Sequence, residues 1–181
     1  MNIKVYKRKG FWFACENHDA PNLPIEKNNC ADFTPLPWCT MQSTLDKLII
    51  RGENSPFYKL LNIKIEEVKE NYARLSIKVG KKHIQFQNAV HGGVITSLAD
   101  SAAAWAIYGS NNWKGTPVTV EMKMNFLRLI NSGTLVAEAR NIHTGSRIFV
   151  SDVDVRNEKD ELIAKSLVTY YLLKSRQKGK V

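Results

Sequence analysis

Apolar residues follow two different spacings along the chain, and the change of spacing separates predicted helices from predicted strands. Leu45, Leu48 and Ile49 have the helical spacing, and Ser55-Pro56 is a typical helix start. From residue 63 onward the period becomes two. The pattern predicts short helices at 40–50 and 56–61, then a hairpin with arms at 63–68 and 72–79 that turns at Glu70-Asn71.

The second half of the chain has one long helical pattern and four strand patterns. Residues 92–108 are apolar around much of the helix circumference, which is typical of a helix enclosed by other structure. We expect an α+β fold in which the strands form an antiparallel meander and the curved sheet wraps around the helix. The strands are predicted near 116–127, 133–144, 147–156 and 161–173, with a turn at 157–160.

The clearest alternation lies in the first of these four strands. Its apolar residues are separated by single polar or charged ones, so they share one face of the strand. We expect this stripe to be part of the core and not a cofactor site. It consists of Val118, Val120, Met122, Met124 and Phe126.

Two glycines open the long helix, where a glycine costs about 1 kcal/mol relative to alanine. Close approach of the backbone to a ligand would explain Gly92 and Gly93, because free amides and the positive end of the helix dipole favour an anion or an oxyanion. Asp100 follows two turns later on the same apolar helix. A carboxylate in such surroundings needs a partner or a function.

Composition indicates one globular domain with short additions at each end. The chain has 181 residues, 44% of them hydrophobic, and no apolar run approaches the roughly 20 residues of a membrane helix. The N-terminus also lacks the apolar region of a secretory signal, so we expect a cytoplasmic protein without membrane contact. We expect an extension at residues 1–40, a folded domain at 41–173 and a basic tail at 174–181, with a hairpin pairing 3–5 with 11–14.

The net charge of +9 is concentrated at the two ends of the chain. Residues 1–9 and 174–181 each contain four basic residues and no acidic one, which leaves a body close to neutral. We therefore interpret the charge as solvated termini and do not expect a nucleic-acid partner.

Cysteine usage does not indicate a disulfide framework. Cys15, Cys30 and Cys39 are an odd number, and with His18 they could make four zinc ligands. Their spacing matches no compact zinc pattern, so we expect free thiols and no metal.

The His91-Gly92-Gly93 motif, with Asp100 seven residues after the second glycine, resembles hotdog-fold acyl-CoA thioesterases of the phenylacetate-pathway (PaaI-like) family. The likeness covers roughly residues 55–173. The resemblance implies a hotdog fold, in which an antiparallel sheet wraps around a long central helix. Two further segments are similar to the family, Pro117-Val118-Thr119-Val120-Glu121-Met122 at the strand entering the active site and Gly145-Ser146-Arg147 at a later turn.

The resemblance also implies catalytic roles. Asp100 is the general base or nucleophile, the Gly92 amide holds the thioester oxygen, and Thr119 helps to place water or the carboxylate. Gln85 occupies a polar position six residues before His91, where many members of the broader family have asparagine and some aryl-CoA thioesterases have glutamine. The expected reaction hydrolyses an acyl-CoA or aryl-CoA thioester to a carboxylic acid and free CoA, with no cofactor beyond the CoA of the substrate.

The residues themselves leave structural roles open. Asp100 could simply bond Ser97, Ser101 or a neighbouring strand, and His91 could cap the helix instead of touching substrate. Gln85 and Thr119 could be ordinary loop and strand residues.

A distance along the helix predicts a shared site. Eight helical residues separate Gly92 from Asp100 by about 12 Å, whereas both groups must lie within a few ångströms of one carbonyl. We therefore expect a homodimer in which each site combines Gly92 of one chain with Asp100 of the other, assembled further into a dimer of dimers. The substrate would contact the backbone at Gly93, and its phosphates would meet candidates Arg147, Arg128, Lys81 and Lys82.

Two other functions fit the same residues. A hotdog hydratase or dehydratase would use His91 and Asp100 for proton transfer. An acyl-CoA-binding sensor with a basic tail would bind without turnover. The acyl specificity and the role of residues 1–40 do not follow from the sequence.

Overall fold

The computed structural model describes residues 3–8, 11–16, 37–110 and 115–173, with side chains from residue 45 onward. The chain divides into two compact units, Met1–Pro37 and Trp38–Val181. In the first unit, strands β1 (Ile3–Arg8) and β2 (Phe11–Glu16) form the predicted antiparallel hairpin, with residues 3–5 paired with 14–16 and not with 11–14.

The second unit follows the predicted order of elements, with ends that differ by a few residues. In the hairpin predicted at residues 63–79, Asn71 adopts a positive φ of 58° in the tight turn, a conformation that asparagine tolerates better than most residues. The elements are α1 (Pro37–Glu53), α2 (Pro56–Leu61), β3 (Ile63–Lys69), β4 (Tyr72–Lys78), the 3-10 turn η1 (Lys81–His83), α3 (Gly92–Ser110), β5 (Thr116–Phe126), β6 (Thr134–Thr144), β7 (Ile148–Asn157) and β8 (Leu162–Leu173).

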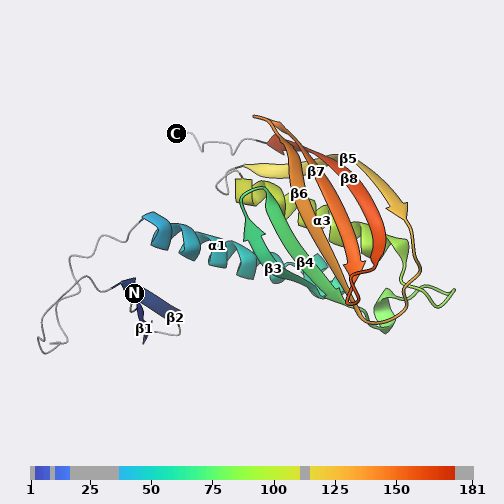
Figure 1. The fold of residues 1–181 in the computed structure, drawn as a ribbon, viewed down its shortest axis with the longest axis horizontal. Coiled ribbons are helices and arrows are strands. Elements are labelled where there is room, and N and C mark those ends of the chain that lie inside the picture. Colours follow the sequence, from blue (N-terminus) through green and yellow to red (C-terminus); the bar gives the residue numbers. More distant parts are fainter. Residues whose placement is uncertain (1–2, 9–10, 17–36, 111–114, 174–181) are drawn as a thin grey trace, which may run out of the picture. The chain divides into compact units, whose positions relative to one another are not determined.

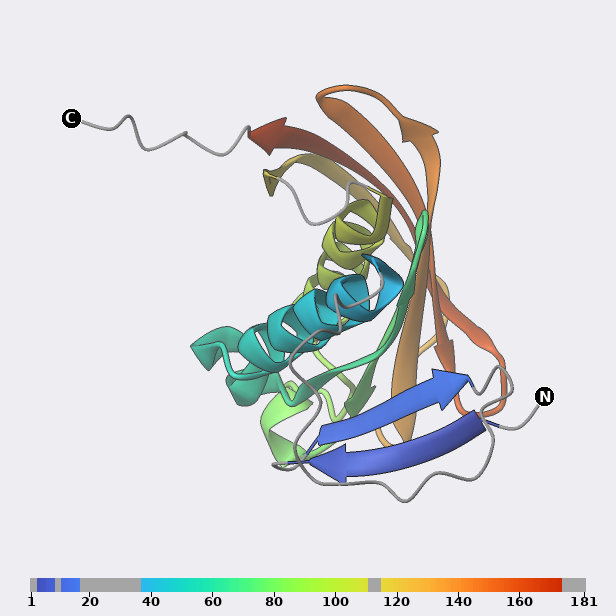
Figure 2. The same cartoon turned by 90° about the vertical axis from the view of Figure 1, so that its left-hand side faces the viewer.

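Helix α3 lies across the concave face of a curved sheet, as both views show (Figure 1, Figure 2). Ten of its nineteen residues are buried, and they pack against residues of the sheet in one hydrophobic core. Residues of α1 and α2 pack against this core, including Leu48 and Leu61. The apolar circumference of α3 therefore predicted its enclosure correctly.

The strand order differs from the expected meander. The sheet has the order β3-β4-β6-β7-β8-β5, so β5 pairs with β8 at the far edge and β6 lies beside β4. Only β6, β7 and β8 form a continuous meander. Alternation within a strand predicts which side chains face inward, but the neighbour of a strand depends on hydrogen bonds between distant parts of the chain.

The apolar stripe of β5 was predicted to be core, and this prediction is wrong for three of its five members. Val118, Val120 and Phe126 are 38%, 61% and 54% exposed, whereas Met122 and Met124 pack against the core. A bulge between Thr119 and Glu121 shifts the register, and β5 is an edge strand. Thr119 shares the inward face with the methionines for this reason.

None of the helices in the described part of the chain is long and apolar enough to cross a membrane. The described residues also contain no group of three His, Cys, Asp or Glu side chains that could hold a metal ion. The possible ligands Cys15, His18, Cys30 and Cys39 lie where the structure describes no side chains.

Candidate active site

His91 caps the start of α3. Its Nδ1 accepts a hydrogen bond from the Gly93 amide at 2.9 Å, and its carbonyl accepts one from the Val94 amide at 2.9 Å. This geometry is that of an N-cap residue. Within the described residues, the Gly92 amide meets no hydrogen-bond acceptor, so one donor remains available at the positive end of the helix.

The loop before the helix brings Gln85 close to this start. Ile84 forms an antiparallel bridge with Val90, and the Gln85 amide donates to the Ala89 carbonyl at 2.8 Å. The Gln85 side chain lies 3.5 Å from Oε1 of Gln87. Gln85 thus lies beside the helix start, held by its backbone and not by a firm side-chain bond.

Buried His83 anchors the same loop. Its Nδ1 accepts a hydrogen bond from the Gly80 amide at 2.9 Å, and its carbonyl accepts one from the His91 amide at 2.8 Å. Burial lowers the pKa of the His83 imidazole, which favours the neutral ring that such an acceptor requires.

Asp100 is bonded from two neighbouring strands. Thr119 of β5 donates its hydroxyl to Oδ1 of Asp100 at 2.9 Å, and Tyr170 of β8 donates to the same oxygen at 2.7 Å. The serine of the preceding turn, Ser97, donates instead to the Gly93 carbonyl at 2.7 Å. Among the described residues Oδ2 of Asp100 accepts no hydrogen bond, so one carboxylate oxygen is held and the other is left for a ligand.

A pocket of about 480 Å³ opens in front of Asp100. One wall comes from successive turns of α3 and the others from α2, β5 and β8, so an aromatic and apolar surface surrounds a few hydroxyl groups. The lining residues are Phe57, Tyr58, Ser97, Asp100, Ser101, Ala104, Pro117, Val118, Thr119 and Tyr170.

Two phenols beside Asp100 stay protonated, one buried (Tyr170) and one partly buried (Tyr58). Burial first, and then the negative charge of Asp100, raise the pKa of the Tyr170 hydroxyl far above its usual range. Burial also raises the pKa of Tyr58, whose oxygen accepts a hydrogen bond from Nε1 of Trp105 at 3.1 Å. Both residues therefore act as neutral donors or acceptors near the carboxylate.

The sequence reasoning did not find Tyr58 or Tyr170. A signal for Tyr170 was present, because the predicted strand at 161–173 alternates and places Tyr170 on the inward face with Val168 and Leu172. A buried tyrosine hydroxyl almost always has a hydrogen-bond partner, so an inward tyrosine opposite a helical aspartate was a candidate for contact.

The structure does not bring the other candidates together within one chain. Gly92 and Asp100 lie on the same helix, about 12 Å apart along its axis. Arg147 bonds the Tyr171 hydroxyl, and Arg128 lies 3.8 Å from Glu161. Three other substrate-binding candidates are exposed: Gly93 at the helix start, and Lys81 and Lys82 in η1.

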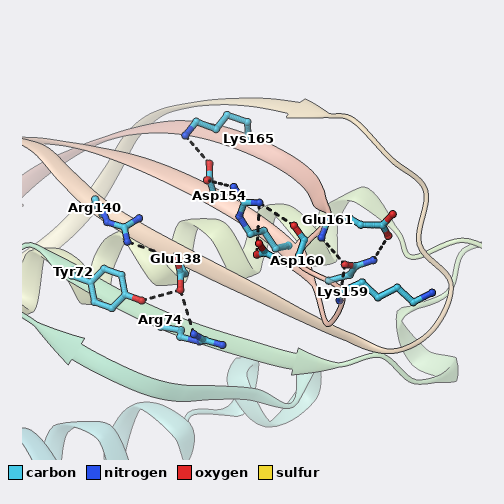
Figure 3. Close-up of polar contacts among 11 residues, drawn as sticks. Tyr72, Arg74, Glu138, Arg140, Asp154, Lys159, Asp160, Glu161 and Lys165 are labelled. Carbon is cyan, nitrogen blue, oxygen red and sulfur yellow. Dashed lines mark hydrogen bonds and ion pairs between the residues drawn. The ribbon is translucent and has the colours of Figure 1, made fainter.

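A second polar cluster lies on the opposite face of the sheet (Figure 3). Lys165 contacts Asp152 and Asp154 at 2.5 and 2.6 Å, and Tyr72 donates to Glu138 at 3.0 Å. These charges pair with one another on a solvated surface, where ion pairs contribute little to stability.

Comparison with known proteins agrees with this architecture. A model of the thioesterase superfamily matches residues 87–164. A protein of Archaeoglobus fulgidus, named as a candidate esterase, is 34% identical over 120 residues, which are 66% of this chain and 76% of the relative. A medium/long-chain acyl-CoA thioesterase of Escherichia coli is 25% identical over 130 residues, which are 64% of this chain and 84% of the relative.

A solved structure supports the same assignment. The Escherichia coli PaaI protein, from the phenylacetic acid degradation operon, aligns with a TM-score of 0.67 and 25% identity over 75% of this chain and 96% of that one. The predicted hotdog architecture and the predicted PaaI-like relationship are confirmed. By its sequence and its fold, the chain belongs to the thioesterase superfamily.

Proposed function

We propose that the protein hydrolyses acyl-CoA or aryl-CoA thioesters to a carboxylic acid and free CoA. The observation that carries the proposal is Asp100, a carboxylate in a pocket with one oxygen held by Thr119 and Tyr170 and the other without a bond from the described residues. A carboxylate held in this way can act as a general base or as a nucleophile.

The reaction can follow either of two balanced routes. In the first, Asp100 takes a proton from water, the hydroxide adds to the thioester carbon, and the carbon–sulfur bond breaks to release the CoA thiolate, which takes up a proton. In the second, Asp100 itself adds to the carbon and expels the thiolate, and water then hydrolyses the mixed anhydride. In both routes the Gly92 amide stabilises the negative charge on the carbonyl oxygen.

A second copy of the chain would complete this site. The helical separation of Gly92 and Asp100 supports a site in which the two groups come from different chains. Exposed apolar residues support such an interface, because Phe86 and Leu129 are 93% and 88% exposed and Val120, on the edge strand β5, is 61% exposed. We expect a homodimer with two identical sites.

The CoA phosphates are expected near η1. Lys81 and Lys82 precede Gln85 by a few residues, and within the described residues Lys81 forms no ion pair. Arg128 and Arg147 are already engaged by Glu161 and Tyr171. Lys82 also donates to the Lys59 carbonyl, at 3.5 Å, so Lys81 is the better candidate for phosphate contact.

The bonding of His91 argues against the hydratase alternative. Its Nδ1 is occupied by the Gly93 amide, which fixes the ring as a cap. Proton transfer to a substrate would have to use the other ring nitrogen alone.

A thiol-release assay over short, medium, long-chain and aromatic CoA esters tests the proposal. We expect turnover of at least one class, and a loss of at least about 10³-fold in kcat in Asp100→Asn, which keeps the shape of the side chain but removes the base. Circular dichroism provides the control for an intact fold. Wild-type activity in folded Asp100→Asn would overturn the mechanism, and binding without turnover would favour a sensor.

The shared site is tested with the same assay. Gly92→Pro removes the amide donor, and proline is tolerated at the first position of a helix. Equimolar Asp100→Asn and Gly92→Pro, dissociated and reassociated together, should regain part of the wild-type activity, because heterodimers contain one intact composite site. Reassociated heterodimers without activity contradict the shared site.

A further inference from the structure

We propose that Tyr170 is a positioning residue which, together with Thr119, holds Oδ1 of Asp100 so that Oδ2 is the oxygen that reacts. This inference rests on the proposed function and assigns a role to a residue outside the helix motif. It also assigns different roles to the two carboxylate oxygens, because Oδ1 is held by hydrogen bonds and Oδ2 reacts.

The strand register places the two hydroxyl groups side by side. Thr119 of β5 and Tyr170 of β8 are directly paired across the ladder, so their side chains leave the sheet on the same face. That face is the one covered by α3, and Asp100 meets both hydroxyls there. The bulge that follows Thr119 ends the regular alternation of β5, so the position of this threonine depends on the bulge.

Both hydrogen bonds end on one carboxylate oxygen. Thr119 lies 2.9 Å and Tyr170 2.7 Å from Oδ1, and the Tyr170 oxygen also lies 2.7 Å from the Asp100 carbonyl oxygen. The Tyr170 hydroxyl has one proton, which these two acceptors share, so the phenol ties both the side chain and the backbone of Asp100 to β8 and opposes rotation of the carboxylate about its Cβ–Cγ bond. Oδ1 has two hydroxyl groups beside it, whereas Oδ2 has none among the described residues, so a proton or a carbonyl carbon meets the more accessible lone pairs on Oδ2.

The phenol is a permanent donor and not a proton carrier. Tyr170 is only 3% exposed, and burial with the adjacent negative charge raises the pKa of its hydroxyl. A phenol in this state keeps its proton throughout the range in which the enzyme would work. Its contribution is therefore to orient Asp100.

A matched pair of residues exists on the opposite face of the sheet. Tyr72 donates to Oε1 of Glu138 at 3.0 Å, which is the same bond between the same chemical groups (Figure 3). That pair lies among exposed arginines and outside the pocket. Tyr72→Phe is accordingly the control for Tyr170→Phe.

Steady-state kinetics tests the proposal. In Tyr170→Phe we expect kcat to fall about tenfold while KM stays within about twofold, because the reacting carboxylate loses a donor that orients it. Tyr72→Phe should leave both quantities unchanged. A folded Tyr170→Phe with the wild-type kcat, or with a change in KM alone, overturns the proposal.

A second measurement separates this inference from the proposed function. In protein with ¹³C-labelled aspartate carboxyls, the carboxyl resonance of Asp100 at neutral pH should shift in Tyr170→Phe, because the carboxylate loses a hydrogen-bond donor, and should stay in place in Tyr72→Phe. If the wild type hydrolyses no CoA ester but the Asp100 resonance shifts, the proposed function fails and the positioning role stands. If the resonance stays in place, the positioning role fails even where the enzyme is active.

A second variant keeps the test available if Tyr170→Phe does not fold. Thr119→Val removes the other donor to Oδ1 on a partly solvated edge strand and keeps the branched shape of the side chain. We expect kcat to fall in this variant as well, with KM nearly unchanged, and the Asp100 carboxyl resonance to shift. An unchanged kcat and an unchanged resonance in this variant overturn the proposal equally.

Discussion

The two ends of helix α3 differ in whether side chains of the protein satisfy the terminal backbone hydrogen-bonding groups. At the C-terminal end, Nδ2 of Asn141 donates to the Ala106 carbonyl at 3.0 Å and to Ser110 at 2.7 Å, while the Ser110 hydroxyl also lies 2.9 Å from that carbonyl. At the N-terminal end, His91 satisfies the Gly93 amide and the Gly92 amide has no acceptor among the described residues. The protein closes one end of the helix with its own side chains and leaves a donor at the other.

The glycines near the two ends differ in the same way. A Cβ at Gly109 would collide with the carbonyl oxygen of Lys69, so this glycine allows the helix to touch the β3–β4 hairpin. A Cβ at Gly92 would meet only the half-exposed ring of Phe126, at 3.2 Å. Packing explains the first glycine, whereas access for a ligand is the better explanation of the second.

Replacement of Gly109 should have the largest effect on stability. Helix propensity alone would make Gly109→Ala stabilising by about 1 kcal/mol, but collision with a backbone atom cannot be relieved by a rotamer change. We expect the free energy of unfolding to fall by at least about 3 kcal/mol, measured by urea denaturation at fixed protein concentration. Gly92→Ala is the control and should change stability by less than about 1 kcal/mol. Equal stability of the two variants would contradict the view that Gly109 is needed for packing and Gly92 is not.

Loss of the Gly92 amide should have the next largest effect, and it should appear in activity. Gly92→Pro removes one oxyanion donor, which lowers kcat by about 10²-fold in comparable sites, while Gly92→Ala keeps the donor. We expect Gly92→Pro to lose that activity at nearly unchanged stability. If Gly92→Ala loses as much activity as Gly92→Pro, space at the helix start matters and the amide does not.

The polar closure of the C-terminal end should have the smallest of these effects. Asn141→Ala leaves the buried Ser151 hydroxyl without the acceptor that lies 2.7 Å away, and it removes the donor to the Ala106 carbonyl. We expect a loss of about 2 kcal/mol in the free energy of unfolding, with activity per folded molecule unchanged. The control is Asn54→Ala, where an asparagine bonds a helix carbonyl in an exposed position and the loss should stay below about 0.5 kcal/mol. Equal losses in both variants would show that burial of this network does not matter.

Local pattern predicted most of the elements and part of the site. The helix at 92–108 is present with its start at Gly92, because its apolar residues and its glycines are both local signals. Thr119 donates a hydrogen bond to Asp100, and the expectation that Thr119 places water or the carboxylate came from the family resemblance and not from the separation of the two residues in the chain. Tyr170 was missed because it is seventy residues away from Asp100 and carries no motif.

The inward and outward faces of β5 could not be predicted in the same way. Its sequence alternates without interruption, yet a bulge after Thr119 exposes Val120 and turns the threonine toward Asp100. A bulge is a property of the pairing between two strands, so a single strand contains no evidence of it. The neighbour of a strand is also a property of pairing and not of one strand alone, which is why β5 was expected beside β6 but lies beside β8.

The sequence by itself determined the periodicity of each element, the apolar character of the central helix and the chemical groups available at its start. These properties depend on residues within a few positions of one another. Only the tertiary structure decided which strand pairs with which, which hydroxyls reach Asp100 and which of its two oxygens they hold. Those outcomes depend on hydrogen bonds between segments far apart in the chain, whose geometry is set by the whole sheet.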